Sequence, residues 1–519
     1  MEIYPRESEN RIESPSIRAS IHVGASAISM LILDCSDMEA PVPLEFLEQP
    51  LPLGRDVFSK GLVTRATTER AAEILAGYLV SLRELGAGPD EVSRVVVSNI
   101  LSEATNKETV SNRLSVATGL SIEILDDGEM TRLVYLKTLR RLHEIESMKK
   151  KVTLVAHVGP GNTRALLFAK GHIDEYGSYR LGTHRTAEII DASFTEGEAQ
   201  LRLIRDNASA PVSRIQFDLR EYQVKELVLI GYEIQLLAPY LLKSENSTRC
   251  SVKALRTLCE EAARLPEDQR ASAYQLDYHT ADALLPALQI NLSIAEAFGL
   301  KYVHIPTSDY ERGLLHDLPF SAGLTREFEA EVIRSASNLA EKYETHSNHG
   351  EQVAFLCKRL FEETQELHHL SDQDSLLLHV AAIVHEVGGF VSPHAHHKHS
   401  QYLILNSEIF GLSERERTLV ALVARYHRMS PPKLTHDRYR SLSHHDRIRV
   451  SKLASLLRVA DALERTHSNR VRDLTVSFHK NKLILQLKDI PDATAERLAL
   501  EYKADLFRDV FGLEVIISE

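Results

Sequence analysis

The sequence has few cysteines and no pair of them at the spacing of metal ligands. Its four cysteines are scattered along 519 residues without a CxxC motif. This pattern disfavours a disulfide framework or a zinc-cysteine site and favours free thiols in a reducing compartment. We therefore expect a cytoplasmic location. The cysteines are Cys35, Cys250, Cys259 and Cys357.

Long apolar runs are also missing. Residues 1–16 are polar and charged, and the apolar run at residues 28–33 is too short for a signal-peptide core or a membrane-spanning helix. No low-complexity segment or coiled-coil heptad pattern occurs. The chain length instead predicts three or four folded domains, because one domain usually contains roughly 100 to 200 residues.

The sequence does not have an excess of basic residues. Its formal net charge is -12, which disfavours broad electrostatic binding to nucleic acid. An anionic substrate must therefore meet local basic groups. Two such groups are Lys398, within a histidine-rich segment, and Arg428.

Histidine is the polar residue that is present in abundance. Taken singly, most of the 24 histidines are expected at the surface or packed in a core. His385 and Glu386, however, directly follow an apolar helical pattern at residues 376–384, and a glycine turn follows them. Imidazoles and carboxylates delivered by separate helices suit metal-assisted hydrolysis of phosphate bonds.

An internal repeat marks the first half of the chain. Residues 21–32 (IHVGASAISMLI) recur as residues 156–167 (AHVGPGNTRALL), and both predict a strand, a glycine turn and a second strand. Glycine lets backbone N–H groups approach a phosphate closely. The repeat therefore predicts two phosphate-binding turns that face one cleft. Their candidate residues are Gly24, Ser26, Gly159, Gly161, Asn162 and Thr163.

Several segments together resemble the exopolyphosphatase and guanosine pentaphosphate phosphohydrolase family. The resemblance covers most of residues 17–310 and returns in the C-terminal half. It implies a duplicated actin-like (ribonuclease H-like) α/β fold at the N-terminus. Its motifs are LPLGR at 51–55, SNILSEATN at 98–106, TGLSIEIL at 118–125, AIVHEVG at 382–388, HKHSQYLI at 397–404 and RYHR at 425–428.

The resemblance also implies a catalytic residue. The family carries two adjacent glutamates before a small residue and an arginine, one of which acts as the general base. Here the pair is reduced to Glu129 followed by Met130. We therefore predict Glu129 as the base that activates water.

Other positions depart from the family pattern. Histidines, His22 and His157, stand where the family has an aspartate in each turn, and Arg164 stands where the second turn usually ends in glutamate. Replacing carboxylates with histidines removes the oxygen ligands that magnesium prefers. Two interpretations stay open: an altered phosphohydrolase, or a binding platform without catalysis.

The C-terminal half is similar to the HD-type phosphohydrolase pattern of a histidine, a His-Asp pair and a distant aspartate. The corresponding residues are His349, His385, Glu386 and Asp461, with glutamate in place of the paired aspartate. The resemblance implies that these four residues bind a divalent metal, for which we expect magnesium or manganese.

These patterns divide the chain into four parts. We expect one actin-like lobe at 17–140 and a second at 141–310, followed by an all-α HD-like domain at 325–470 and a small α+β tail at 471–519. A charged helix at about 138–151 ends the first lobe, and a linker spans about 309–324. In the tail, alternation predicts two strands, a helix at 493–511 and a last strand at 513–518.

The leading function is hydrolysis of a phosphoanhydride in polyphosphate or guanosine pentaphosphate. One alternative is a catalytically degenerate protein that binds polyphosphate or an alarmone. The other is a metal-dependent nucleotide phosphohydrolase whose HD-like domain alone is the enzyme. We expect a homodimer, with no nucleic-acid or membrane partner.

Overall fold

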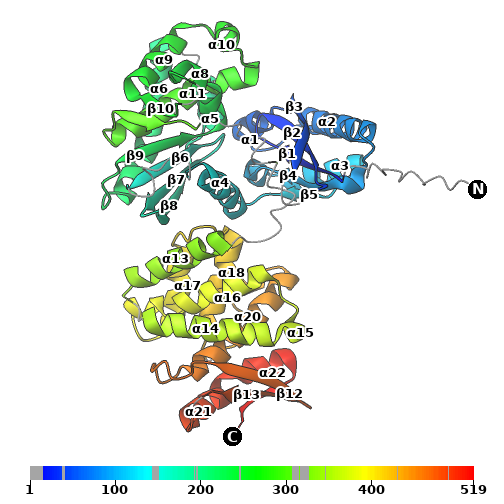
Figure 1. Ribbon diagram of the computed structural model, residues 1–519, viewed down its shortest axis with the longest axis vertical. Coiled ribbons are helices and arrows are strands. Elements are labelled where there is room, and N and C mark those ends of the chain that lie inside the picture. Colours follow the sequence, from blue (N-terminus) through cyan, green and yellow to red (C-terminus); the bar gives the residue numbers. More distant parts are fainter. Residues whose placement is uncertain are drawn as a thin grey trace, which may run out of the picture.

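The computed structural model describes most of the chain. The described residues are 16–37, 41–142, 151–191, 193, 197–244, 247–306, 315, 326–344, 347–428, 430–488 and 490–518. They form two α/β lobes, a helical domain and a small α+β tail (Figure 1). The two lobes together lie at one end of the long axis, the helical domain in the middle and the tail with the C-terminus at the other end.

Lobe I is built on a sheet with strand order β3-β2-β1-β4-β5. Strands β1 and β2 are almost completely buried, which requires cover on both faces of the sheet. The strands are β1 (Ile17–Val23), β2 (Ala27–Asp34), β3 (Val42–Pro50), β4 (Val92–Val97) and β5 (Ile122–Ile124). The helices are α1 (Leu53–Lys60), α2 (Arg65–Glu84), η1 (Pro89–Glu91), η2 (Asn99–Glu103) and α3 (Lys107–Thr118).

Lobe II has a sheet with strand order β10-β11-β9-β6-β7-β8. Its strands are β6 (Thr153–Val158), β7 (Thr163–Ala169), β8 (His172–Tyr179), β9 (Glu226–Ile230), β10 (Arg249–Ser251) and β11 (Tyr302–His304). Its helices are α5 (Thr183–Asp191), α6 (Gly197–Asp218), α7 (Tyr232–Leu236), α8 (Ala238–Leu241), α9 (Val252–Arg264), α10 (Glu267–Ala273) and α11 (Tyr278–Ala297).

The two sheets confirm the internal repeat. Read from β3 and from β8, each sheet has the same sequence of neighbours: two antiparallel pairs, then two parallel pairs. The turns that join β1 to β2 and β6 to β7 therefore occupy equivalent positions in the two lobes. Figure 1 shows the lobes side by side at one end of the molecule.

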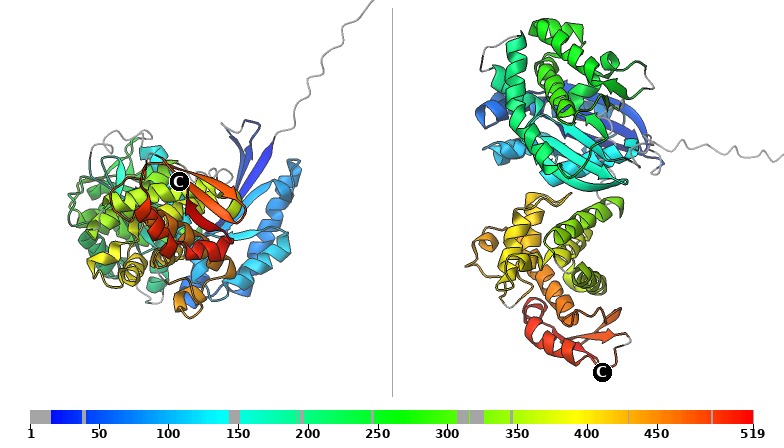
Figure 2. Two further views of the ribbon diagram at one scale, coloured as in Figure 1. Left: turned by 90° about the horizontal axis from the view of Figure 1, so that it is seen from below. Right: turned by 90° about the vertical axis from the view of Figure 1, so that its left-hand side faces the viewer.

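The helical domain forms the middle of the stack (Figure 2). Its central helix α16 is apolar on most faces, and it contacts α14, α13 and α18. The helices are α13 (Arg326–Lys342), α14 (Ser347–Glu363), α15 (Gln365–His368), α16 (Asp372–Val384), η4 (Val387–Phe390), α17 (His396–Leu405), α18 (Glu414–Arg425), α19 (Asp437–Arg440) and α20 (His444–Leu463).

The tail follows the predicted pattern, with one correction. Its sheet has the order β12 (Leu474–His479), β13 (Lys482–Leu487) and β14 (Glu514–Ile517). The single helix expected at 493–511 is two helices, α21 (Thr494–Lys503) and α22 (Asp505–Phe511), which meet at Ala504. The apolar period continues across this break, so sequence pattern alone does not reveal it.

Helix α4 (Asp127–Leu142) links lobe I to the rest of the molecule. Its Tyr135 ring packs against Phe168 of lobe II and against Phe328 and Phe410 of the helical domain, with ring centroids 5.2 to 6.5 Å apart. Aromatic clusters of this kind bury large apolar areas. The expected charged helix at 138–151 overlaps the end of α4, but its later part lies outside the described residues, as does most of the expected linker at 309–324.

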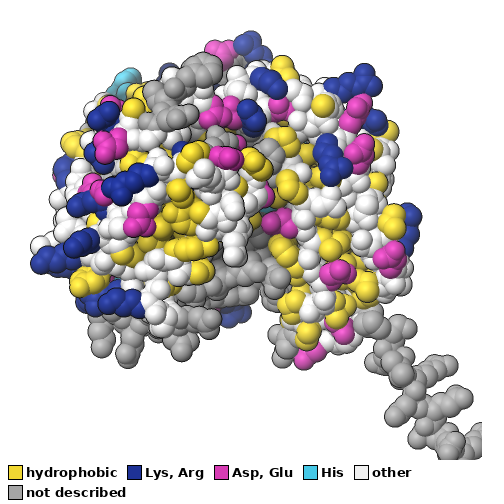
Figure 3. Space-filling view, turned by 90° about the horizontal axis from the view of Figure 1, so that it is seen from above, with side chains coloured by type: hydrophobic (Ala, Val, Ile, Leu, Met, Phe, Trp, Pro, Cys, Tyr) yellow, Lys and Arg dark blue, Asp and Glu magenta, His cyan; other side chains and the backbone are white. Residues whose placement is uncertain are grey.

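The structure can be compared with the expectations about membrane-spanning helices and cysteine pairs. Over the described residues, no helix is both long and apolar enough to cross a membrane. The four cysteines are free and buried. In the view of Figure 3, acidic and basic side chains are interspersed over both lobes, with no continuous basic surface.

Candidate functional site

The two glycine turns face one cavity between the lobes. In each turn the first glycine donates its N–H to the carbonyl that closes the turn: Gly24 to Ala27 at 2.8 Å, and Gly159 to Asn162 at 3.0 Å. Both turns line a single cavity that opens to solvent. The repeat therefore produces the facing turns that the sequence predicted.

Most of the predicted phosphate-binding residues line this cavity. Gly24, Ser26, Gly159, Gly161 and Asn162 are in its wall. Thr163 is not, because its hydroxyl is buried and donates to the carbonyl of Leu181 at 2.6 Å. Among the described residues, those that line the cavity all come from the two lobes, so Lys398 and Arg428 lie elsewhere.

Three nitrogen-bearing side chains lie at the base of the cavity. His22 and His157 occupy equivalent places near the ends of β1 and β6, and both are buried. Arg164 is the cross-strand neighbour of His157, and its side chain is 3% exposed. Its guanidinium donates a hydrogen bond to Asp127, whose other contact is the amide of Asn99 at 3.1 Å.

Carboxylates also line the cavity, and each has hydrogen-bond donors around it. Glu103 accepts two hydrogen bonds from Arg185 at 2.7 and 2.8 Å. Glu233 accepts from Thr183 at 2.8 Å and lies 3.5 Å from His184. Glu48 accepts from Ser29 of lobe I and Tyr232 of lobe II.

Glu129, the predicted base, lies just outside the cavity wall. Its carboxylate is 2.8 Å from Arg94 and 3.7 Å from Arg132, whereas its neighbour Met130 lines the cavity. Successive helical residues point about 100° apart, so the side chains of positions 129 and 130 cannot both face the cleft. A role for Glu129 as base therefore remains a prediction that requires its carboxylate to turn away from Arg94.

The second cluster of functional side chains lies in the helical domain. His349 on α14, His385 at the end of α16 and Asp461 on α20 are brought together although more than 100 positions separate the first from the last. Their ligand atoms lie within 4.8 Å of one another. The structure therefore brings together the histidines and the distant aspartate that the sequence singled out.

Distances within this cluster show which groups face one another. His349 Nε2 is 3.6 Å from Asp461 Oδ1 and 4.0 Å from Glu386 Oε2. His349, His385 and Asp461 are buried, whereas the Glu386 side chain is 31% exposed. Glu386 therefore lies on the solvent side of the cluster.

Burial and charge set the protonation states of the cluster. Burial lowers the pKa of His385 below its usual value, despite the nearby carboxylates. Burial alone would raise the pKa of Asp461, but His349 and Lys503 hold it well below its ordinary range. The cluster is thus set up with a neutral imidazole at His385 and a charged carboxylate at Asp461, the forms that bind metals.

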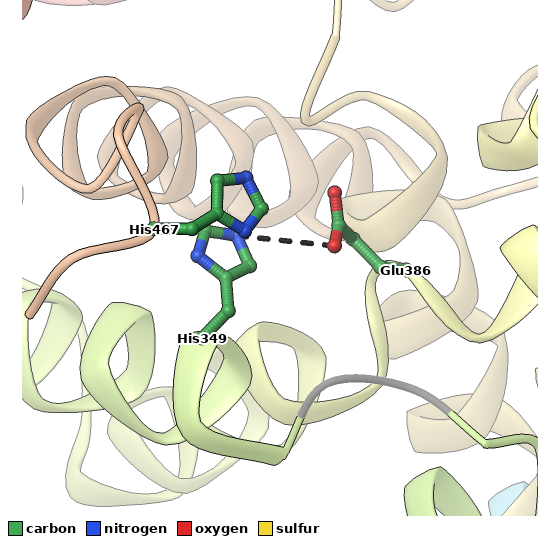
Figure 4. Close-up of side chains that lie close together, drawn as sticks. All are labelled: His349, Glu386 and His467. Atoms are coloured by element: carbon green, nitrogen blue, oxygen red, sulfur yellow. Dashed lines mark ion pairs between the residues drawn. The ribbon is translucent and has the colours of Figure 1, made fainter.

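Two further histidines surround the cluster. His427 forms an edge-to-face contact with His385, at 4.9 Å between ring centroids. His467 follows α20 and stacks on His349 with centroids 3.8 Å apart (Figure 4). His467 could not be selected from the sequence, because it lies in a turn with no periodic pattern and only the fold places it over His349.

A glycine allows the local packing around His385. An added Cβ at Gly388 would lie 2.1 Å from the carbonyl oxygen of His396 and 2.3 Å from the backbone nitrogen of Ser400. The second residue after the His385–Glu386 pair must therefore be glycine, so that α17 can pack against η4. This packing brings His396 next to His427.

The two predicted basic residues lie at the surface of the helical domain. Lys398 borders a shallow depression together with Arg417 and Arg438. Arg428 Nη1 lies 3.4 Å from His396 Nδ1. Lys398 and Arg428 are both presented by this domain and are separate from the interlobe cavity.

Family comparison accounts for most of the chain. The family model for the Ppx/GppA phosphatase family matches residues 41–320, and the model for Ppx/GppA phosphatase domain III matches residues 333–508. The first match by itself covers more than half of the sequence. The second coincides with the helical domain and part of the tail.

Individual relatives are distant in sequence. A guanosine-5'-triphosphate,3'-diphosphate pyrophosphatase from Aeromonas hydrophila subsp. hydrophila is 22% identical over 363 residues, covering 69% of this chain and 70% of that protein. A protein of the same name from Photobacterium profundum is 19% identical over 490 residues, covering 90% and 91%.

A solved structure shows the shared fold. An exopolyphosphatase from Cytophaga hutchinsonii superposes with a TM-score of 0.51 at 16% identity, covering 59% of this chain and 99% of that one. This likeness, with the repeated sheet topology, confirms the expected α/β class of the N-terminal half.

Proposed function

Because the chain belongs to the Ppx/GppA phosphatase family, we propose that it hydrolyses a phosphoanhydride bond of polyphosphate or guanosine pentaphosphate in the interlobe cavity. The observation that carries this proposal is the pair of equivalent glycine turns on one cavity. The names of the relatives and of the solved neighbour support the same two substrates.

The side chains of the cavity suit binding of a phosphate chain. Backbone N–H groups of tight turns bind phosphate oxygens, and a guanidinium makes strong charge-assisted hydrogen bonds to them. Arg164 supplies a guanidinium in the cavity wall, which also donates a hydrogen bond to Asp127. His22 and His157 add imidazole donors beside it.

This arrangement separates phosphate binding from metal binding. The family resemblance implies acidic residues in the turns, which hold a divalent ion against the phosphate. In this chain an arginine and two histidines occupy those places. We therefore propose that the cavity binds phosphate without magnesium or manganese, and that any metal requirement of the reaction arises elsewhere.

The direct test is phosphate release by the purified protein from polyphosphate and from guanosine pentaphosphate. We expect release from at least one of them, and substrate binding that persists in EDTA. An absence of release from both, with and without magnesium or manganese, would contradict the proposed activity. Loss of binding in EDTA would contradict the role given to Arg164.

A binding protein without turnover is the second candidate function. It is favoured by Met130 in the cavity wall, at the place of the second family glutamate, and by the pairing of Glu129 with Arg94. This candidate predicts that polyphosphate binds in calorimetry and that no phosphate is released. Measuring both on one preparation separates the two functions.

Two finer expectations remain proposals. One is that the helical domain is HD-like, which its family match leaves open. The other is that the protein is a cytoplasmic homodimer; sedimentation of the full chain tests the dimer, and cell fractionation tests the location.

A further inference from the structure

Asp127, at the start of α4, contacts one cavity-lining side chain from each lobe. Its Oδ1 accepts a hydrogen bond from the guanidinium of Arg164 in lobe II, and a second one from Asn99 Nδ2 in lobe I at 3.1 Å. Arg164 and Asn99 both line the interlobe cavity, whereas Asp127 does not. Asp127 therefore lies behind the cavity wall and joins two residues that face the cavity.

This arrangement lets Arg164 bind a ligand without leaving Asp127. A guanidinium carries several N–H donors in a planar fork, and the hydrogen bond to Asp127 uses Nη2. A phosphate group in the cavity does not need the place of the Asp127 carboxylate, because that carboxylate is not part of the wall. An acceptor behind an arginine fixes the direction of its fork, as supporting residues do for groups that contact a ligand.

The first turn of α4 packs closely against the helical domain. Gly128 is buried beside Asp127. An added Cβ at Gly128 would lie 2.4 Å from the backbone nitrogen of Ser413 and 2.8 Å from the carbonyl carbon of Leu412. Ser413 is the N-cap of α18, so the contact joins α4 to a capped helix end. Only glycine allows α4 to approach α18 this closely.

Two further contacts hold the same helix. Thr131 Oγ1 lies 2.7 Å from the hydroxyl of Tyr176 on β8, and the Tyr176 ring packs edge-on against Phe410 with centroids 5.7 Å apart. One turn further along α4, Tyr135 packs against Phe328 and Phe410. The helical domain thus fixes the helix that carries Asp127, although none of its described residues lines the cavity.

We propose that Asp127 is a positioning residue that sets the direction of the Arg164 guanidinium in the interlobe cavity, and that the helical domain keeps Asp127 in place through Gly128 and the first turn of α4. This inference rests on the proposed binding of phosphate in that cavity, but it does not depend on turnover. It gives the helical domain a role in phosphate binding that requires no contact with the ligand.

The test is the affinity of the full chain for tripolyphosphate, measured by calorimetry in EDTA. The loss of a carboxylate near an anion site should, by charge alone, strengthen binding. If Asp127 positions Arg164, Asp127→Ala should instead weaken binding by about tenfold, because a misdirected guanidinium loses charge-assisted hydrogen bonds to the phosphate. Asp127→Asn keeps an oxygen acceptor without the charge, so it should bind at least as tightly as the wild type.

The matched control for these variants is Asp126→Asn. Asp126 is the neighbouring acid, and its Oδ1 accepts a hydrogen bond from the backbone N–H of Glu129 at 2.8 Å. Asparagine can accept the same bond at a helix start, so this variant loses the charge alone and should not bind more weakly than the wild type. Tighter binding in Asp127→Ala, as in Asp127→Asn, would mean that Asp127 competes with the ligand for Arg164, and would overturn the proposal.

Gly128→Ala tests the role of the helical domain. The added methyl group forces α4 away from α18, so the affinity should fall as it does in Asp127→Ala, although no side chain of the cavity changes. The control is Gly77→Ala on α2, where an added Cβ meets no atom within 4 Å, and this variant should bind as the wild type does. Wild-type affinity in Gly128→Ala would overturn the role of the helical domain.

Thermal melting shows whether each variant is folded. If Gly128→Ala does not fold, Phe410→Leu replaces it, because it removes the ring that contacts both Tyr135 and Tyr176. We expect a smaller loss of affinity in this variant, and wild-type affinity would contradict the proposal. A wild type that does not bind tripolyphosphate would overturn both the proposed cavity function and this inference. Unchanged affinity in Asp127→Ala, with normal binding by the wild type, would overturn the positioning role alone.

Discussion

The interlobe cavity and the histidine cluster of the helical domain have opposite chemistry. The cavity presents glycine turns, two histidines and the buried guanidinium of Arg164. The carboxylates in its wall accept hydrogen bonds from neighbouring side chains, and we propose that the cavity binds an anion. The cluster presents a buried aspartate and imidazole lone pairs, so it suits a cation.

This difference separates two roles that the family resemblance places together. Acidic residues in the glycine turns would hold a metal beside the phosphate. Here the turn positions carry cationic or neutral nitrogen groups, and the carboxylate with histidine ligands lies in another domain. We therefore expect that phosphate binding and metal binding can be removed one at a time.

The largest expected effect concerns the proposed base. In Glu129→Gln the neutral amide cannot take a proton from water, so phosphate release should fall by roughly 100-fold or more. Glu123→Gln is a matched control, because Glu123 contacts the same Arg94 at 2.7 Å. Equal rates in both variants would show that Glu129 is not the base.

The next effect tests the fixed charge of the cavity. Arg164→Met should weaken binding of tripolyphosphate in EDTA by about tenfold to 100-fold, since a charged hydrogen bond contributes about 1.5–3 kcal/mol. Calorimetry gives the affinity. The control Arg256→Met removes an arginine that pairs with Glu296 on the surface of lobe II, and this variant should bind tripolyphosphate as the wild type does. A similar loss of affinity in both variants would show that Arg164 acts only through the overall charge of the protein.

A third variant tests how the tail contributes to the metal site. Lys503→Met should lower metal affinity about tenfold, because Asp461 loses the donor that orients it. Lys482→Met removes a tail lysine that lies 3.9 Å from Glu514 and should have no effect. Tighter metal binding in Lys503→Met would show that the ammonium competes with the ion and does not position its ligand.

Acid should destabilise the helical domain through its buried histidines. Burial, with the charge of Lys358, lowers the pKa of His379 to about 4. Since this lies below the unfolded value, the neutral histidine contributes stability above about pH 6.5 that is lost as pH falls toward 4. In His379→Gln the loss of unfolding free energy between pH 7 and 5 should shrink by roughly 1–2 kcal/mol. Urea titrations measure it, and the exposed His479→Gln should behave as the wild type.

The smallest effect concerns the surface of the helical domain. Changing Lys398 and Arg428 together to alanine should lower affinity for long polyphosphate by about twofold to fivefold, since exposed charges are screened and contribute little. Guanosine pentaphosphate is too short to reach both domains, so its affinity should not change. Equal losses for the two ligands would mean that a long substrate does not extend from the cavity to this surface.

Most of the architecture was predictable because it rests on periodicity and repetition. The two copies of a strand, glycine turn and strand predicted equivalent sheets, and the alternation in the tail predicted two strands, which are β12 and β13. The break between α21 and α22 was not predictable, because an apolar helical period runs through Ala504.

The sequence predicted which residues belong to the site, but it did not fully predict the directions in which their side chains point. The sequence selected His349, His385, Glu386 and Asp461 from their order along the chain, and the structure brings them together. It did not show which of Glu129 and Met130 faces the cavity, because neighbouring positions on a helix differ by about 100°.

The sequence by itself determined which residue types stand at each local position. It places glycine where a turn must approach a ligand, arginine and histidine where the family has acids, and histidine at the end of a buried helix. Only the tertiary structure decided which of these groups meet. It paired Arg164 with Asp127, closed His396 onto His427, placed His467 over His349 and brought Lys503 of the tail to Asp461. Each of these contacts joins separate elements, and their relative position depends on side-chain packing across the whole core, which no local pattern encodes.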